Sequence, residues 1–261
     1  MSNFSKAFDT IPFELFLKKI EHMGFAEETI EWFRTYLYDR HQYCEVNGTK
    51  STVRQVTCGI PQGTVLGPLV FLLFTCEVAG NIDSSLLAYA DDTTIVSIAD
   101  TLTELQTMAQ RDYNILTDWY YQSRLTLNGN KCKYMLFGCN KTDKLNLNIQ
   151  MHPLERVEKY KLVGMILDDK LTWGFHVGKV RTRLQCVYHM LCKAKRNLNT
   201  RCRLLIYNSL FRSYLTYGIE HYGSATKTTL NPLLVLQKKC IRTVFGLEYN
   251  STTKDTCIDN N

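Results

Sequence analysis

The sequence lacks the features that would place the protein in a membrane, outside the cell or around a structural zinc ion. Its ten cysteines lie singly among 261 residues, and no Cys-x-x-Cys pair occurs, so we expect neither a zinc site nor a disulfide framework. The longest apolar run, residues 65–79, is interrupted by Gly67, Pro68 and Glu77 and is too short to span a bilayer comfortably. No basic segment followed by an apolar core opens the chain, so we expect no secretory signal and an intracellular protein with reduced thiols, in either nucleus or cytoplasm.

Acidic residues are nearly absent from the last third of the chain. Residues 174–246 contain 13 lysines and arginines but a single acid, Glu220, whereas the rest of the chain has 18 basic and 24 acidic residues. This asymmetry indicates a polyanionic partner, either a nucleic acid or an anionic membrane. The alternative is a solvated helical surface. The basic side chains expected to face outward, on the first and last helices of this region, are Lys179, Arg181, Arg183, Lys238, Lys239 and Arg242.

The first two thirds of the chain mix helical and strand patterns. Apolar residues recur at helical spacing over 13–23, 26–38 and 101–124. We expect Thr10 to cap the first of these helices and Pro12 to lie in its first turn. A Gly-Pro-rich loop at 59–68 leads into the apolar helix. The expected strands are 42–46 and 51–57, joined by the hairpin signal Asn47-Gly48, a hairpin over 85–97, and strands at 125–127, 134–138, 145–151 and 160–167.

After Trp173 the pattern becomes purely helical. One helix carries an apolar stripe from Val177 to Leu191, a second runs from about residue 203 to 217, and a third is expected to begin at Asn231-Pro232 and to end at Gly246. The tail beyond residue 247 is polar, and we expect it to be disordered. The predicted fold class is therefore α+β: an antiparallel sheet flanked by helices over residues 1–172, followed by an all-helical basic region over 173–247.

Two adjacent carboxylates, Asp91 and Asp92, lie at the tip of the predicted hairpin, directly after Tyr89. Side by side, they repel each other unless a cation lies between them, and hard divalent metals take oxygen ligands. An ordinary Asp-containing turn is the alternative. The pair alone therefore leaves both a metal site and a plain turn open.

Five segments, taken together and in order, resemble the palm motifs of reverse transcriptases, most closely those of jockey-like non-LTR retrotransposons. They are FSKAFD at residues 4–9, GIPQGTVLGP at 59–68, SLLAYADDTTIVS at 85–97, LNGNKCKYMLF at 127–137 and YKLVGMILDDKLTW at 160–173. Residues 213–222 and 236–242 are similar to the thumb of the same elements. The resemblance implies a palm over residues 1–172, a helical thumb over 173–247 and a chain that lacks the fingers because it is truncated at its N-terminus.

The resemblance also implies a chemistry: addition of deoxynucleotides to a DNA primer on an RNA template by two-metal phosphoryl transfer. Two Mg²⁺ ions about 3.5–4 Å apart would be held chiefly by Asp91, assisted by Asp92. Lys131 matches the lysine proposed to protonate pyrophosphate, with a solvated surface lysine as the alternative. The residues implied to contact the nucleotide are Phe8, Gln62, Gly63 and Tyr89. Gly164 lies in the segment similar to the primer grip, and a nucleic acid rather than a membrane is the implied partner of the basic helices.

One position departs from the family pattern. The first motif normally opens with Asp five residues before its bulky aromatic, but counting back from Phe8 gives Asn3. An amide oxygen can touch a metal, but it brings no negative charge, and Asp9 is badly placed to substitute. We therefore expect little or no polymerase activity. The alternative function is a non-catalytic protein that binds nucleic acid through the basic helices.

Overall fold

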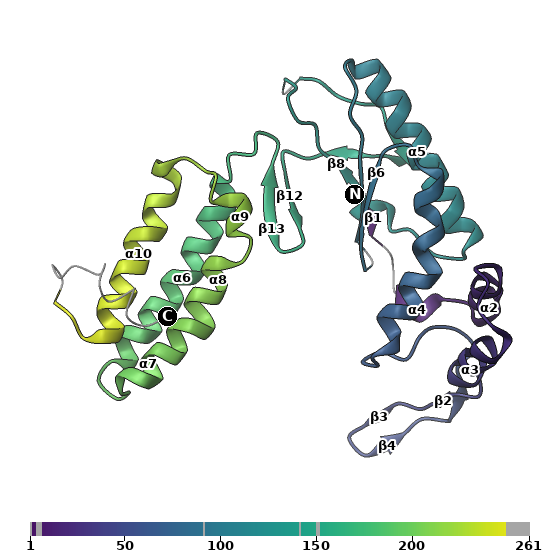
Figure 1. Cartoon of the computed structure of the whole chain (residues 1–261), viewed down its shortest axis with the longest axis horizontal. Coiled ribbons are helices and arrows are strands. Elements are labelled where there is room, and N and C mark those ends of the chain that lie inside the picture. The colour runs from purple at the N-terminus through teal and green to yellow at the C-terminus, as the bar shows by residue number, and fades with distance from the viewer. Residues whose placement is uncertain (1, 4–6, 91, 141, 150–151, 249–261) are drawn as a thin grey trace. The chain divides into compact units, whose positions relative to one another are not determined.

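The computed structural model describes residues 2–3, 7–90, 92–140, 142–149 and 152–248 (Figure 1). Its contacts divide the chain into two compact units. Unit 1 comprises residues 1–134 and 140–157, and unit 2 comprises residues 135–139 and 158–261. The division falls near residue 158, so the hairpin that follows it belongs to unit 2. The names palm and thumb remain predictions for these units.

Unit 1 is built on amphipathic helices. They are α1 (Ala7–Thr10), α2 (Phe13–His22), α3 (Glu27–Leu37), α4 (Leu66–Thr75) with the 3₁₀ turn η1 (Cys76–Asn81), and α5 (Leu102–Gln122). Their apolar faces form one core that includes the fully buried Phe16, Ile20, Val70 and Phe74. The α5 helix is capped by Thr101, whose hydroxyl accepts the Glu104 N–H and donates to the Glu104 carboxylate.

A three-stranded antiparallel sheet in unit 1 has the order β1-β7-β6, with β1 at Ser2–Asn3, β6 at Ser85–Tyr89 and β7 at Asp92–Val96. Two short pairs lie elsewhere in the unit. β8 (Lys133–Tyr134) pairs in parallel with β11 (Glu155–Arg156), and β9 (Asn148–Ile149) pairs antiparallel with β10 (His152–Pro153). The 3₁₀ turn η2 (Gly129–Lys131) precedes β8.

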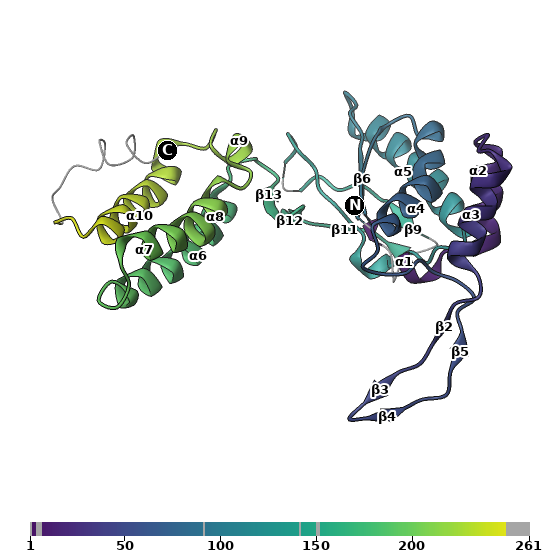
Figure 2. The same cartoon turned by 60° about the horizontal axis from the view of Figure 1, so that its bottom comes forward.

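A two-stranded arm extends from the helices of unit 1 (Figure 2). It consists of β2 (His41–Gln42), β3 (Glu45–Val46), β4 (Thr49–Lys50) and β5 (Arg54–Gln55), all of them exposed. The predicted turn is confirmed, because Val46 pairs with Thr49 and both Asn47 and Gly48 have positive φ angles of 51° and 81°. Two consecutive positive φ angles are the signature of a type I′ hairpin turn.

Unit 2 consists of a hairpin and a helical bundle. The hairpin is β12 (Lys159–Leu162) and β13 (Met165–Asp168). The helices are α6 (Gly174–Ala194), α7 (Thr200–Ile206), the π-helical segment η3 (Tyr207–Arg212), α8 (Ser213–Thr216), α9 (Ile219–Tyr222) and α10 (Lys227–Phe245). Figure 1 shows α6 and α10 side by side, and their buried faces meet around Leu184, Leu191 and Cys240.

Several sequence expectations need correction. Residues 160–167 form a hairpin instead of one strand, because Val163 and Gly164 both have positive φ angles. The last helix begins at Lys227 and not at Asn231-Pro232, since the Thr226 hydroxyl accepts the Thr229 N–H and caps it earlier. Thr10 ends α1 instead of capping α2, whose N-cap is Pro12.

The strands expected over 125–127 and 134–138 are also wrong in extent. Only Lys133–Tyr134 is a strand there. The strand expected over 145–151 is reduced to Asn148–Ile149 among the described residues. For the segments 125–127 and 134–138, the alternating pattern is too short to outweigh the turn around Gly129.

Candidate functional site

The sheet of unit 1 brings together three of the predicted site positions. β7 is the central strand, and Asp92 is paired with Tyr89 of β6 on one side and with Asn3 of β1 on the other. The backbone of Asn3 is thus directly across from Asp92. Tyr89 is two-thirds exposed and Asp92 is half-buried. Asp91, the other member of the predicted pair, lies outside the described residues.

The open end of this hairpin is anchored to α5. Asp112 is fully buried, and its Oδ2 accepts the Ser84 N–H at 3.0 Å. The Ser84 and Ser97 hydroxyls are 2.7 Å apart and link the two strands. Because a buried carboxylate bonded to backbone fixes that backbone strongly, Asp112 holds the start of β6 at a defined place.

Lys131 ends the η2 turn, which contacts β1. The next residue, Cys132, is buried against Tyr113 of α5 and Ile95 of β7. Burial, with a further contribution from the Cys132 thiol, raises the pKa of Tyr113 well above its usual value. The turn that carries Lys131 is therefore packed against the strand that carries Asp92, while the Lys131 side chain itself is exposed.

The predicted nucleotide loop is bonded to the segment that carries Phe8. The Gly59 N–H donates to Ile11 O at 2.8 Å and the Ile60 N–H donates to Phe8 O at 2.7 Å. Gly59 has a φ of +84°, and a Cβ there would lie 2.6 Å from Asp9 O. Gln62 Nε2 donates to Asp9 Oδ1 at 2.7 Å, so Asp9 positions the glutamine. Gly63, at the end of the loop, is exposed and has open space around its Cα.

Phe8 is half-buried, and its ring stacks on Phe71 of α4 with centroids 4.6 Å apart. It also packs against the core of unit 1. The structure therefore shows a core contact for Phe8, and a contact with a nucleotide sugar stays a prediction.

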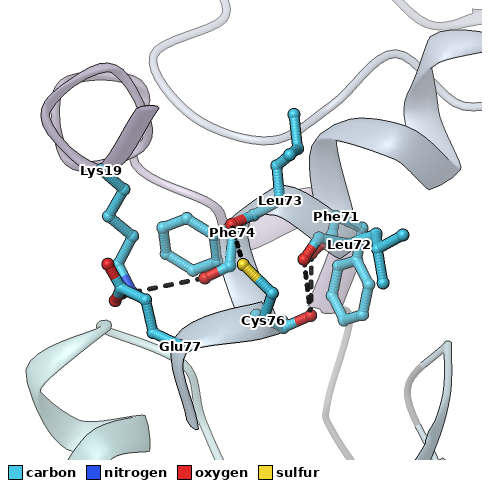
Figure 3. Close-up of polar contacts among 8 residues, drawn as sticks. Lys19, Phe71, Leu72, Leu73, Phe74, Cys76 and Glu77 are labelled. Carbon is cyan, nitrogen blue, oxygen red and sulfur yellow. Dashed lines mark hydrogen bonds and ion pairs between the residues drawn. The ribbon is translucent and has the colours of Figure 1, made fainter. Parts of the chain in front are cut away.

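A partly buried ion pair fixes the η1 turn, which follows α4, to α2. Figure 3 shows Lys19 reaching toward Glu77 and the carbonyl of Phe74, with Nζ 2.6 Å from Glu77 Oε2 and 3.3 Å from Phe74 O. The ammonium also lies over the Trp119 ring at 4.6 Å from its centroid. These contacts connect α2, α4 and α5.

Of the predicted nucleic-acid contacts in unit 2, Lys179, Arg181, Arg183 and Lys238 are exposed. None of these four forms an ion pair with a described carboxylate. Lys239 and Arg242 are half-buried, and their contact with a nucleic acid stays a prediction. Both lie on α10 beside its buried face, so the exposed members of the predicted set are the three on α6 and Lys238.

Gly164 forms the tip of the β12–β13 hairpin, close to α8. The Tyr217 hydroxyl donates to Val163 O at 2.6 Å, and a Cβ on Gly164 would lie 3.2 Å from the Tyr217 ring. A pocket of about 360 Å³ opens beside this tip and is lined by Lys161, Gly164, His176, Lys179, Tyr214 and Tyr217, among others. Sequence patterns did not single out Lys161 or His176. His176 lies on the buried face of α6, where a helical pattern predicts a core residue.

The described residues include only one of the two predicted metal ligands, Asp92. Among them, no three His, Cys, Asp or Glu side chains gather into a metal site. Asp92 supplies a carboxylate, and the residue across from it is an asparagine, which adds no charge.

No helix in the described ranges has the length and apolar character needed to cross a membrane.

A family model described as reverse transcriptase (RNA-dependent DNA polymerase) matches residues 3–167. The chain is 26% identical over 235 residues to the RNA-directed DNA polymerase from mobile element jockey of Drosophila melanogaster, covering 85% of this chain and 25% of that protein. It is 27% identical over 262 residues to the jockey polymerase of Drosophila funebris, covering 96% and 28%. A probable RNA-directed DNA polymerase from transposon BS of Drosophila melanogaster is 26% identical over 259 residues, covering 94% and 28%. The chain thus spans about a quarter of the length of these curated relatives.

Proposed function

Because the chain belongs to the reverse transcriptase (RNA-dependent DNA polymerase) family, we propose that it is a polymerase segment that binds primer and template but extends the primer weakly or not at all. Its partners are an RNA template, a DNA primer and deoxynucleoside triphosphates. Unit 1 corresponds to the palm and the α6–α10 bundle to the thumb. The family generally uses divalent metals, so Mg²⁺ is the expected cofactor.

The pairing of Asn3 with Asp92 carries this proposal. Neighbouring residues on adjacent antiparallel strands lie about 4.5–5.5 Å apart, so a carboxylate at position 3 would reach the same ion as one at position 92. With asparagine there, the site has lost one negative charge. Mg²⁺ keeps its waters unless carboxylates or phosphates replace them, so we expect weak Mg²⁺ binding by Asp91 and Asp92.

The remaining predicted site residues have roles that follow from their places. Gln62 and Gly63 present an amide and an open backbone to the nucleotide, and Tyr89 presents an exposed ring beside Asp92. Phe8 would lie under the sugar, and Lys131 would donate a proton to the leaving pyrophosphate. Gly164 and the basic residues of α6 and α10 would contact the primer–template backbone.

Primer extension tests the polymerase proposal. Using a labelled DNA primer on an RNA template with Mg²⁺ or Mn²⁺, we expect little or no product from the unmodified chain. We expect Asn3→Asp to increase extension and to tighten Mn²⁺ binding measured by electron paramagnetic resonance. Asp100→Asn removes an exposed carboxylate outside the site and should change neither quantity. Robust extension by the unmodified chain, lost on Asp91→Ala, would overturn the claim of weak activity.

A second function, nucleic-acid binding without catalysis, is favoured by four exposed basic side chains of unit 2 that form no ion pair with a described carboxylate: Lys179, Arg181, Arg183 and Lys238. Backbone contacts release counterions, so affinity should fall steeply with salt. We expect a primer–template duplex to bind with the same affinity with and without Mg²⁺, and equally in Asp92→Asn. Duplex binding that requires Mg²⁺ would favour the polymerase function. Absence of duplex binding at low salt would contradict both proposed functions.

A further inference from the structure

The α4 helix is apolar on the side that faces solvent as well as on the side that faces the core of unit 1. Its sequence, LGPLVFLLFT, includes no charged side chain, and Gly67, Val70, Phe71 and Phe74 are buried. A helix that is apolar all round is normally covered on every side, by protein or by a membrane. At about 15 Å long, α4 would span only half of a bilayer core, so a second protein surface is the cover that fits it.

The exposed side chains of α4 form a stripe at the spacing that helix pairs use. The residues of this surface, here called the α4 outer stripe, are Val65, Pro68, Leu69, Leu72 and Cys76. Val65 is 95% exposed, Leu69 44% and Leu72 62%. Figure 3 shows Leu72 on the side of α4 away from Lys19. Residues four, seven and eleven positions apart lie on one face of a helix, so the stripe is a continuous apolar ridge.

Aromatic rings on α3 extend this apolar surface. The Tyr36 hydroxyl lies 2.8 Å from the hydroxyl of Thr64, which directly precedes Val65. The Tyr36 ring is stacked on the Trp32 ring with centroids 5.9 Å apart, and half of the Trp32 surface is exposed. Contiguous exposed apolar patches on a protein mark places where another surface binds.

The composition of the α4 outer stripe favours a second copy of the same chain over a charged partner. From Gln55 to Cys76 the sequence contains no Asp, Glu, Lys, Arg or His, so the stripe has no charge with which to pair an acidic or basic partner. Interfaces between identical chains are the more apolar class and resemble a protein core cut in half. The stripe is also self-complementary. With a twofold axis between Pro68 and Leu69, Val65 lies across from the partner's Leu72.

We propose that the α4 outer stripe is the contact surface of a homodimer, in which α4 of one protomer packs antiparallel against α4 of its partner. Trp32 and Tyr36 lie at the rim of this contact. Because the stripe covers one face of a short helix, the dimer is weak, with a dissociation constant on the order of 10 μM. The inference does not rest on the proposed function, since the contact needs neither metal nor nucleic acid.

Sedimentation velocity of the full chain, with a thiol reductant and without nucleic acid, tests the proposal between about 1 and 200 μM protein. We expect a monomer–dimer equilibrium that persists when the salt is raised from about 0.1 to 0.5 M, because salt does not screen apolar contacts. Leu72→Lys introduces one charge from each protomer into the contact and should raise the dissociation constant at least about tenfold. Leu205→Lys, at a leucine of α7 that is 69% exposed, should change it less than about twofold.

Circular dichroism checks that each variant is folded. If Leu72→Lys fails to fold, Val65→Lys replaces it, since the side chain of Val65 is almost fully exposed and contributes little to the fold. A photoreactive benzoylphenylalanine at position 65 should crosslink two protomers, and the same residue at position 205 should not. A monomer at every concentration would overturn the proposal. So would open-ended aggregation, a dimer that dissociates at high salt, or equal effects of the lysine variants in α4 and α7.

Discussion

In unit 1, several polar side chains have partners within the protein, whereas unit 2 presents basic side chains that lack a described acidic partner. Lys19 is paired with Glu77, Gln62 with Asp9, and Asp112 with a backbone N–H. In unit 2, the exposed Lys179, Arg181 and Arg183 of α6, here called the α6 basic triad, form no ion pair with any carboxylate that the structure describes.

This difference distinguishes polar side chains that hold segments of the protein in place from charged side chains that are available to bind another molecule. Paired polar groups between distant segments define where a loop or strand lies, and their loss is felt as lost stability. Unpaired charges of one sign repel one another and do not stabilise the fold. If the proposed function holds, we expect substitutions in unit 1 to act mainly on folding, and charge removal in unit 2 to act mainly on binding.

The largest expected effect is that of Gly59→Ala in unit 1. The new Cβ would meet the backbone of Asp9, and the positive φ of Gly59 disfavours alanine. We expect the free energy of unfolding to fall by about 2–5 kcal/mol. Gly63→Ala, in the same loop with positive φ but open space, should cost only about 1–2 kcal/mol. Urea unfolding of the two variants measures the difference, and equal losses would contradict the close approach of the loop to Asp9.

A smaller effect is expected for Glu77→Gln, which leaves the buried Lys19 without its counter-charge. Because Glu77 is about one-third exposed, solvent screens part of the loss, and we expect about 1–3 kcal/mol. Glu45→Gln breaks the exposed pair with Lys50, whose atoms are 3.9 Å apart, and should cost at most about 1 kcal/mol. Urea unfolding again provides the measurement. Equal losses of unfolding free energy in the two variants would show that burial does not determine how much these ion pairs stabilise the fold.

Local signals in the sequence were enough to place most helices and the central hairpin. Thr101 and Glu104 mark the start of α5, Gly246 ends α10, and Asn47-Gly48 specifies the turn of the arm. The expectations failed where two local signals competed. Thr226 outweighs Asn231-Pro232 as the start of α10, and Pro232 is accommodated inside the helix.

The candidate site was less accessible to sequence reasoning, because its contacts join distant segments. The pairing of Asn3 with Asp92 was implied only by the order of family motifs, since no periodicity connects residues so far apart. Gln62 was singled out, but its bond to Asp9 was not. His176 lies on the apolar stripe of α6, and its unpartnered nitrogen depends on a contact with Ile166 that a helical pattern cannot specify.

A modest pH effect is expected in unit 2. Burial and then the charge of Lys179 lower the pKa of His176, so below the unfolded pKa of about 6.5 the unfolded chain binds a proton that the folded chain does not. The free energy of unfolding should therefore fall as the pH drops below about 6.5. In urea unfolding between about pH 5 and 7.5, His176→Gln should reduce this slope. A slope unaffected by His176→Gln would contradict a buried neutral imidazole.

Asp168 does not confuse this measurement, although it lies in the same unit. Burial alone would raise the pKa of its carboxyl, but N–H groups of Thr172, Trp173 and Lys170 and the Thr172 hydroxyl lower it on balance. Its stabilising effect is therefore present above its unfolded pKa of about 3.9 and is lost only as the pH falls below that value.

The smallest effect on folding is expected when all three residues of the α6 basic triad are changed to glutamine. Because these exposed side chains have no described acidic partner, the free energy of unfolding should change by no more than about 0.5 kcal/mol. Binding of a primer–template duplex should respond differently, with the slope of log affinity against log salt falling by roughly 1 for each lost phosphate contact. Lys18→Gln, an exposed lysine on α2 of unit 1, should leave that slope unchanged. If the triple variant instead lost stability and kept its salt slope, the basic residues of α6 would serve the fold, and the contrast between the two units would fail.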